Sequence, residues 1–286
     1  MLKLRTLALA ALTYLAGCTS LFEPAPVTRW AVYYDEKLEA EAFQNLDVVV
    51  FDRIHHPKLD PLKGKVTMLG YVSIGEVFGH APEKAILEKD GLLIEENTLW
   101  KSYIVDVSSA KWKAMVLGYV DDVAAQGFDG VMLDTGESPI VWAQLKNPMR
   151  LKAMEAGIVD IIKAIRKNHP NMKIMVNRAF RILPAVADDI DYVLAESIYT
   201  NTNVSTGQYA LFPPNTFNEV AKQLHQLGAL APRLKIFTLD YWNTDDVNGL
   251  ERIYAAQRAQ GFIPYVTTPD LRSFTPEPVF TRLRRY

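Results

Sequence analysis

Short apolar runs alternate with stretches of helical periodicity from residue 30 to residue 267. The runs are nearly continuous in apolar side chains, which is typical of parallel strands covered on both faces. Between several of them, apolar residues recur at helical spacing. The predicted strands are Ala31–Tyr34, Leu46–Phe51, Val66–Gly75, Phe128–Asp134, Met172–Asn177, Asp191–Glu196, Leu234–Asp240 and Phe262–Thr267.

The intervening segments predict five helices and one irregular excursion, Val77–Tyr103. Capping residues mark several helix ends, since Ser or Asp favours the start of a helix and Gly its end. The predicted helices are Asp35–Asn45, Ser108 or Ser109 to Gln126 before Gly127, Asn147–Asn168, Thr216–Leu227 ended by Gly228, and Thr244 or Asp245 to Gln260 before Gly261.

Eight β/α units in one chain predict a (β/α)₈ TIM barrel, formed by residues 30–286 as a single domain. A doubly wound open sheet is the alternative. Such a sheet normally has a glycine-rich phosphate turn after its first strand. Here the first strand is followed by Tyr34, Asp35 and Glu36, without a glycine, which favours the barrel.

The N-terminus has the pattern of a secretory signal. Lys3 and Arg5 precede the apolar run Leu7–Leu15, and Leu15-Ala16-Gly17-Cys18 resembles a bacterial lipobox. We therefore expect a signal peptide over residues 1–17, lipidation of Cys18, and a tether over residues 18–29. Thr19 after the cysteine favours an outer-membrane lipoprotein that faces the periplasm or the cell surface. The alternatives are an ordinary signal peptide and an apolar N-terminus with an incidental cysteine.

Composition narrows the possible chemistry. Cys18 is the only cysteine, so a lipidated Cys18 leaves no thiol for a disulfide, a metal or a nucleophile. Without Lys3 and Arg5, the 31 basic residues become 29 against 33 acidic ones, a net charge of −4. No basic stripe is present to follow a phosphate backbone, so nucleic acid is not an expected partner.

Five carboxylates close separate apolar runs. Strand ends of one parallel barrel meet at its C-terminal mouth, where such barrels place their active sites. A buried charge must be paired or neutralised, so these acids predict a polar pocket for a sugar or a cation. The five residues are Asp52, Glu76, Asp134, Glu196 and Asp240.

Asp134 and Glu196 are the candidate catalytic pair. Hydrolysis of a glycosidic bond needs two carboxyl groups, one protonated to assist the leaving oxygen and one ionised as nucleophile or base. These two residues end the fourth and sixth strands and can face each other across the mouth. Alternatively, each acid caps the following helix or pairs with Arg178 or Arg181.

Other residues near the strand ends are candidates for substrate binding. Aromatic rings can stack on sugar faces, although packing within the barrel is the commoner role of any one ring. A metal site built from Asp52, His55 and His56 is disfavoured, because no HxH or HExxH spacing exists. We expect no metal and no cofactor. The further substrate-binding candidates are Tyr34, Tyr71, Tyr199, Tyr241, Trp242 and Asn177.

Six motifs carry a resemblance to a known family. They are YVSIGE at Tyr71–Glu76, DVSSAKWK at Asp106–Lys113, GFDGVMLDTGES at Gly127–Ser138, DYVLAES at Asp191–Ser197, TLDYW at Thr238–Trp242 and GFIPYVT at Gly261–Thr267. Together they resemble glycoside hydrolase family 114, the endo-α-1,4-polygalactosaminidases, and the hydrolase domains of Pel-type exopolysaccharide systems.

The resemblance implies a TIM-barrel hydrolase of an α-1,4-linked galactosamine-rich polysaccharide. It places the family's catalytic pair at Asp134, expected as nucleophile, and Glu196, expected as acid/base. It also implies that Asp52, Glu76 and Asp240 contact substrate. The lipoprotein signal and the excursion from Val77 to Tyr103 depart from the family pattern. Two other hypotheses remain: a non-catalytic carbohydrate-binding lipoprotein, and a hydrolase of another bacterial glycan.

Overall fold

The computed structural model describes residues 29–203 and 205–278. Eight parallel strands follow one another around a nearly closed barrel, and each pairs in parallel with the next. At the seam, the indole nitrogen of Trp30 on the first strand donates to the carbonyl of Ile263 on the last, at 2.9 Å. The strands in barrel order are β1 (Trp30–Tyr33), β2 (Val48–Phe51), β3 (Thr67–Ser73), β7 (Gly130–Asp134), β8 (Lys173–Asn177), β9 (Tyr192–Glu196), β12 (Lys235–Tyr241) and β13 (Ile263–Thr267).

These strands confirm the predicted TIM barrel, and each of the eight apolar runs corresponds to one strand. Their bounds agree with the prediction to within two residues. All four residues of β2 are buried, as are those of β1, because side chains on one face fill the barrel interior and those on the other pack under helices. This covering on both faces explains the continuous apolar runs.

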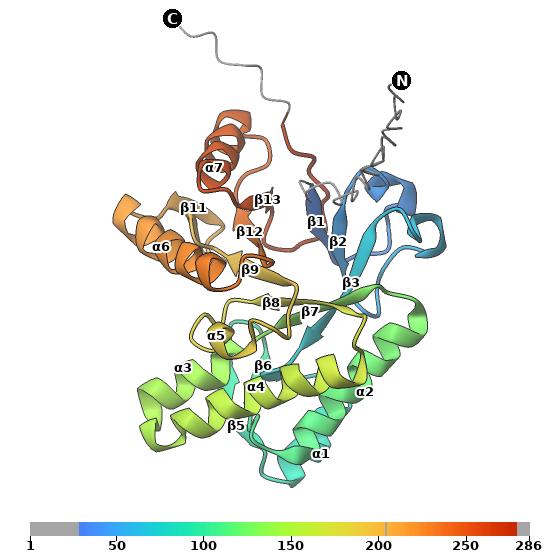
Figure 1. Cartoon of the computed structure of the whole chain (residues 1–286), viewed down its shortest axis with the longest axis vertical. Helices are drawn as coiled ribbons and strands as arrows, with labels where there is room; N and C mark the ends of the chain where they lie inside the picture. Colours follow the sequence, from blue (N-terminus) through green and yellow to red (C-terminus); the bar gives the residue numbers. More distant parts are fainter. Residues whose placement is uncertain (1–28, 204, 279–286) are drawn as a thin grey trace, which may run out of the picture.

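Helices pack around the outside of the barrel in the order in which they occur in the sequence. In Figure 1, α2 and α4 lie below the sheet and α6 and α7 lie at the upper left. Ser109 caps α2 by accepting from the backbone N–H of Lys111, and Gly127 ends it with φ 92°, both as predicted. The longer helices are α2 (Ala110–Gln126), α3 (Glu137–Lys146), α4 (Leu151–Asn168), α6 (Pro214–Leu230) and α7 (Val247–Ala259).

The helix predicted over Asp35–Asn45 is wrong: only Ala40–Phe43 forms a single 3₁₀ turn, η1. The Asp35 carboxylate accepts from the backbone N–H groups of Glu36 and Lys37. The N–H of Leu38 then donates to the hydroxyl of Tyr33. These bonds give the backbone an alternative to a helical first turn, as Asp often does.

Several other helix boundaries also differ from the prediction. Helix α4 begins at Leu151 rather than Asn147, because Pro148–Arg150 forms a separate 3₁₀ turn, η3. Helix α6 continues through Gly228 to Leu230. The cap of α7 is Asp246, whose side chain accepts from the N–H of Gly249, rather than Thr244 or Asp245.

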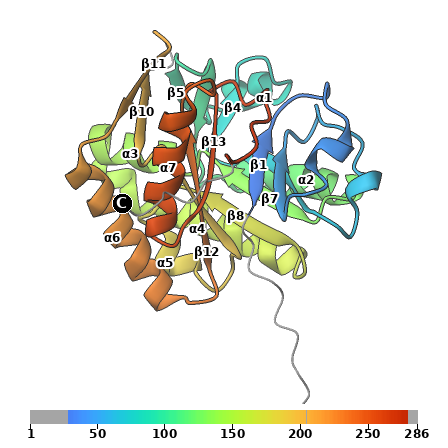
Figure 2. The same cartoon turned by 90° about the horizontal axis from the view of Figure 1, so that it is seen from above.

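Two insertions rise from the C-terminal ends of the strands. The segment predicted as an irregular excursion forms a three-stranded antiparallel sheet with a short helix, so that prediction is wrong. A second insertion, after β9, is a hairpin. Figure 2 shows both insertions at the same end of the barrel. The elements are β4 (Glu76–Phe78), α1 (Glu83–Lys89), β5 (Leu93–Asn97) and β6 (Ser102–Val105), then β10 (Thr200–Asn203) and β11 (Gln208–Leu211).

The remaining elements are the 3₁₀ turn η2 (Asp60–Leu62) and the short helix α5 (Leu183–Val186). No helix formed by residues 29–203 and 205–278 is both long and apolar enough to cross a membrane. The predicted signal peptide, Cys18 and all of the tether except Arg29 lie outside the described residues.

Candidate active site

A cleft of about 620 Å³ opens at the C-terminal ends of the barrel strands. Its floor consists of strand-end side chains, and its walls come from the first insertion, the segment after β7 and the segment after β13. Of the predicted site residues, the cleft brings together Tyr34, Asp52, Tyr71, Glu76, Asp134, Asn177, Glu196 and Tyr241.

The amide of Asn177 connects Asp134 and Glu196 on the cleft floor. Its Nδ2 donates to Asp134 Oδ1 at 2.9 Å and to Glu196 Oε2 at 2.6 Å. Laid end to end, these two bonds place the two oxygens at most about 5.5 Å apart, closer than the about 6.5–9.5 Å typical of inverting glycosidases and consistent with the about 5–5.5 Å of retaining ones. The two acids therefore face one reaction centre.

Burial raises the pKa of both acids. For Asp134 it is the largest effect; hydrogen bonds from Asn177, the N–H of Thr135 and Tyr71 oppose it, and the charge of Glu76 adds to it. For Glu196, burial raises the pKa first and the charge of Asp134 raises it further. Two acids placed so close do not readily ionise together. One carboxyl group of the pair can therefore keep its proton while the other is ionised, as general acid catalysis requires.

Three tyrosines surround the pair. The Tyr241 hydroxyl donates to Glu196 Oε1 at 2.7 Å. The rings of Tyr34 and Tyr71 meet edge to face with centroids 5.3 Å apart. Burial, followed by the charges of the nearby carboxylates, raises the pKa of each of these phenols well above its usual value. The phenols therefore stay protonated, and Tyr71 donates to Asp134 as Tyr241 does to Glu196.

The backbone is strained directly after each central residue. Thr135 follows Asp134 with φ 63°, Arg178 follows Asn177 with φ 51°, and Ser197 follows Glu196 with φ 52°. The left-handed region is uncommon for residues other than glycine and costs of order 1–3 kcal/mol each. The strands thus end in sharp turns that fix the direction of the preceding side chain.

Contacts around Thr135 hold one of these turns in place. Its hydroxyl donates to the carbonyl of Asp134 at 2.6 Å and accepts from the N–H of Gly75 at 2.9 Å. A Cβ at position 75 would lie 2.1 Å from the carbonyl oxygen of Thr135, so only glycine fits there. Ser73, which lies beside Asp134 on the neighbouring strand β3, also contacts the Thr135 hydroxyl at 2.7 Å.

Asp52 has a different surrounding from the central pair. One of its oxygens accepts from the backbone N–H groups of Ile54 and His55, each at 2.7 Å. His56 instead packs its ring against Phe51 and Phe128. Throughout the described ranges, no group of three or more His, Cys, Asp and Glu side chains is arranged to hold a metal ion.

Three of the predicted substrate-binding residues do not line the cleft: Asp240, Tyr199 and Trp242. The expected convergence of all five acids is therefore wrong for Asp240. Asp240 is buried and accepts from the N–H groups of Tyr199 and Thr200, the Thr200 hydroxyl and the amide of Gln257 on α7. Leu239, not Asp240, pairs with Glu196. Side chains alternate along a strand, so Leu239 and Tyr241 face the cleft while Asp240 faces the helices.

The other two excluded residues pack outside the cleft. The ring of Tyr199 lies edge to face on Phe217 of α6, with centroids 4.9 Å apart. The indole of Trp242 donates to Asp246 at 2.9 Å and lies beside the ring of Tyr209 on the hairpin. Packing within the shell of the barrel is therefore their role in this structure.

Neither Arg178 nor Arg181 forms a side-chain ion pair with Asp134 or Glu196. Arg178 donates through Nε to Glu137 at 2.7 Å and through a terminal nitrogen to the carbonyl of Glu196. Arg181 pairs with Glu155. Asp134 and Glu196 accept from Asn177 and Tyr241 instead. The alternative in which Arg178 or Arg181 pairs with these carboxylates is therefore wrong.

Several cleft residues were not predicted. Asn97, Trp100 and Ser102 come from the first insertion, and Asp270 to Arg272 come from the segment after β13. The aromatic and β-branched residues Tyr103, Ile104 and Val105 were a weak strand signal that could have found the insertion.

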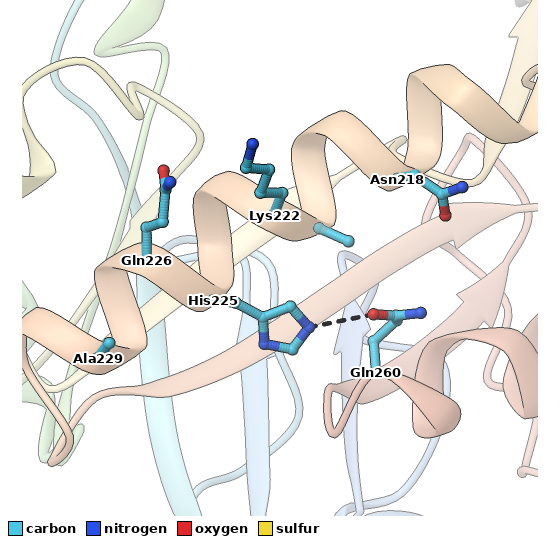
Figure 3. A pocket seen from close by; sticks show the side chains of 7 residues that line it. Asn218, Lys222, His225, Gln226, Ala229 and Gln260 are labelled. Carbon is cyan, nitrogen blue, oxygen red and sulfur yellow. Dashed lines mark hydrogen bonds between the residues drawn. The ribbon is translucent and has the colours of Figure 1, made fainter.

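A second depression lies on the outer surface, beside α6. Figure 3 shows His225 of α6 pointing toward Gln260, with a hydrogen bond of 3.0 Å between them. Among the described residues, Lys222 is the one charged side chain that lines this groove, and neither Asp nor Glu takes part. It offers no pair of carboxyl groups, so the cleft at the barrel mouth is the candidate active site.

A model of glycoside-hydrolase family GH114 matches residues 12–281. The chain belongs to this family. The family's model thus covers the barrel, both insertions and the residues of the cleft, and it confirms the predicted resemblance.

Related proteins and structures agree with this assignment. A protein of Thermotoga maritima is 28% identical over 219 residues, which cover 72% of this chain and 66% of that protein. One of Methanocaldococcus jannaschii is 22% identical, over 72% of this chain and 62% of that protein. The chain thus spans slightly less than two thirds of either relative.

Two solved structures are similar to the chain. The glycoside hydrolase domain of PelA from Pseudomonas aeruginosa is 25% identical with a TM-score of 0.77, over 87% of this chain and 98% of that domain. Ega3 of Aspergillus fumigatus, solved in complex with galactosamine, is 16% identical with a TM-score of 0.62, over 90% of this chain and 97% of that one. The second likeness concerns the fold alone.

Proposed function

We propose that this member of family GH114 hydrolyses an α-1,4-linked, galactosamine-rich polysaccharide with Asp134 as nucleophile and Glu196 as acid/base. The observation that carries this proposal is the single amide of Asn177 that binds both acids on the floor of one cleft. Their spacing suits attack by one carboxylate on the anomeric carbon, with retention of configuration.

In the first step, Asp134 forms a bond to the anomeric carbon while the glycosidic C–O bond breaks. Glu196 gives its proton to the leaving oxygen. In the second step, Glu196 removes a proton from a water molecule, which attacks the same carbon and frees Asp134. Asp134 accepts from Asn177, the N–H of Thr135 and Tyr71, which favour its ionised form, and the charge of Asp134 raises the pKa of Glu196, which favours the protonated form of that acid.

The proposed substrate is supported by the charge of the cleft and by the relatives. Six acids line the cavity together with two arginines, Arg178 and Arg272, and a cleft with an excess of acids concentrates a cationic polymer. The six acids are Asp52, Glu76, Asp134, Glu137, Glu196 and Asp270. Ega3 was solved with galactosamine, and PelA contributes a hydrolase domain of the same fold. Cleavage should weaken as salt rises, because salt screens this attraction.

The test is release of reducing ends from partially deacetylated galactosaminan by Asp134→Asn and Glu196→Gln. Each variant should fold and lose about 10²–10⁴ in rate, the usual contribution of a single acid or base. Asp188→Asn, an exposed aspartate far from the cleft, is the matched control and should keep full activity. Unchanged rates in both site variants would contradict the assignment.

Two alternatives give different outcomes in the same assays. Saturable binding of the polymer without cleavage would identify a carbohydrate-binding protein. Cleavage of a different bacterial glycan, lost in the same two variants, would keep the mechanism and change the substrate. The lipobox at Leu15–Cys18 supports the further proposal that the enzyme is a lipoprotein, tethered to the outer membrane through Cys18.

A further inference from the structure

Arg178 lies directly after Asn177, at the point where β8 ends and the chain turns away from the strand. Its φ is 51° and that of Ala179 is 46°, so two consecutive residues adopt a conformation that is uncommon outside glycine. The Arg178 side chain lines the cleft together with the catalytic pair. Neither step of the proposed reaction uses this cation, although the backbone is strained to place it there.

The Arg178 side chain takes the place of a backbone hydrogen bond at the end of β8. Asn177 pairs with Leu194 of β9, and the Arg178 N–H donates to the carbonyl of Leu194 at 2.8 Å. In a parallel ladder the next acceptor on β9 lies two residues further on, at the carbonyl of Glu196. The guanidinium of Arg178 donates to that carbonyl, also at 2.8 Å. Arg178 therefore holds the backbone of the proposed acid/base at the last residue of its strand.

Glu137 fixes the other side of the same guanidinium. It is the first residue of α3 and follows Asp134 closely in the sequence. Its Oε2 accepts from Arg178 Nε at 2.7 Å, and the guanidinium carbon lies 5.7 Å from the centre of the Phe180 ring. Arginine suits this position because its planar fork directs donors to two acceptors at once, whereas lysine carries one compact charge. One planar group thus connects the segment after Asp134 with the backbone of Glu196.

From this arrangement we propose that Arg178, fixed by Glu137, is a positioning residue that sets the place of Glu196 relative to Asp134. We call the two residues the Glu137–Arg178 clamp. The clamp deepens the proposed function and rests on it. Asn177 joins the two carboxyl groups, whereas the clamp joins the backbone segments that carry them. A displacement of about 1 Å can cost about 10² in rate, so the clamp acts on kcat.

The clamp also places a positive charge close to Glu196. Burial and the charge of Asp134 raise the pKa of Glu196, while hydrogen bonds from Tyr241 and Asn177 and the charge of Arg178 lower it. Loss of the Arg178 charge should therefore raise this pKa. Titratable or charged groups of five neighbouring segments face Glu196: Tyr34, Tyr71, Asp134, Arg178 and Tyr241.

The test compares variants of the clamp by pH–rate profiles on partially deacetylated galactosaminan. Arg178→Lys keeps the charge but loses the fork, so kcat should fall about tenfold or more while KM and the basic limb stay in place. Arg178→Gln loses both, so the basic limb, set by the proton on Glu196, should also move to higher pH. Glu137→Gln removes the counter-charge of Arg178, so the basic limb should move to lower pH.

Arg181→Gln is the matched control. Arg181 forms an ion pair with Glu155, and its side chain is 57% exposed. Its replacement removes the same charge from the same segment, outside the cleft, and should leave kcat, KM and both limbs unchanged. Full kcat in Arg178→Lys would overturn the clamp. A basic limb that does not move in opposite directions in Arg178→Gln and Glu137→Gln would overturn it as well.

A second measurement separates the clamp from the proposed function. Absence of cleavage by the wild type would contradict the proposed function. The clamp would then be tested by NMR titration of the Glu196 carboxyl group, which needs no turnover. The pKa of this group should be higher in Arg178→Gln than in the wild type and unchanged in Arg181→Gln, because only the first variant removes a charge beside Glu196. Equal values in all three proteins would overturn the clamp.

Discussion

Asp134 and Glu196 accept hydrogen bonds from one and the same amide nitrogen. That nitrogen belongs to Asn177, which is 3% exposed and whose own carbonyl oxygen is buried without a partner within the described structure. Such an arrangement couples the two acids, since any change in the amide affects both. It is also costly in free energy, which is more typical of a functional centre than of packing.

Asn177→Ala should therefore shift the pH dependence of the reaction. Hydrogen bonds from Asn177 lower the pKa of both acids, so their loss raises both values. The acidic limb, set by ionisation of Asp134, and the basic limb, set by the proton on Glu196, should both move to higher pH. A pH–rate profile measures this. The exposed Asn168→Ala serves as control, and a lower rate without any shift would contradict the coupling.

Asp134→Asn should raise thermal stability at neutral pH. Burial raises the pKa of Asp134 in the folded protein, so the folded state binds more protons than the unfolded one above the ordinary pKa of 3.8. The free energy of unfolding then falls as pH rises from there through the folded pKa. Removing the group should flatten this fall. Melting curves across pH check the prediction, and identical curves for both proteins would refute it.

Asp240→Ala should destabilise the protein without affecting substrate binding. The change leaves the buried N–H groups of Tyr199 and Thr200 and the amide of Gln257 without their acceptor, at a cost of about 1–3 kcal/mol. Denaturant unfolding gives the loss of stability, and KM should stay at its wild-type value. A raised KM at unchanged stability would return Asp240 to the substrate site.

Ser197→Gly should stabilise the fold by relieving the backbone after Glu196. Ser197 has φ 52°, a conformation that glycine adopts without the steric cost of a Cβ. We expect a gain of about 1 kcal/mol in the free energy of unfolding, at the low end of the cost of such strain. Ser205→Gly, in an exposed turn without positive φ, should give no gain. A loss of stability in both variants would contradict the inference that the backbone is strained at Ser197.

Cys18→Ser should release the protein from the membrane fraction. Two or more acyl chains are needed for stable anchoring, and the thioether-linked lipid requires the cysteine sulfur. Fractionation of cells and incorporation of labelled palmitate measure the effect. Hydrolysis by the released protein should be unchanged, which separates anchoring from catalysis. Retention of the Ser variant in the membrane would contradict lipidation.

The barrel was predictable because its strands are buried on both faces. Val48–Phe51 and Gly130–Leu133 are buried throughout, so their sequences read as continuous apolar runs. The first insertion was not predictable in this way. Its strand β5 has no fully buried residue, and half-exposed strands of four or five residues leave little periodicity. The predicted helix with an acidic start at Asp35 is likewise absent. The Asp35 carboxylate instead accepts hydrogen bonds from the two backbone N–H groups that follow it.

The part of the candidate site that is formed by residues at strand ends was predictable from the sequence. Asp134, Asn177 and Glu196 end successive strands and meet on the cleft floor, as expected. The same reasoning placed Asp240 wrongly, because the end of a strand does not give the phase of its side chains. In β12 the strand continues to Tyr241, which turns Asp240 toward α7. The register between neighbouring strands decides which residues of β12 face the cleft, and this register cannot be read from the sequence.

The first insertion is contiguous in sequence, between β3 and α2, whereas Asp134, Asn177 and Glu196 come from the barrel itself. One wall of the cleft is therefore encoded by a single stretch of the gene. Replacing residues 77–105 with those of a relative would exchange this wall as one segment and leave the three strand-end residues of the cleft floor in place.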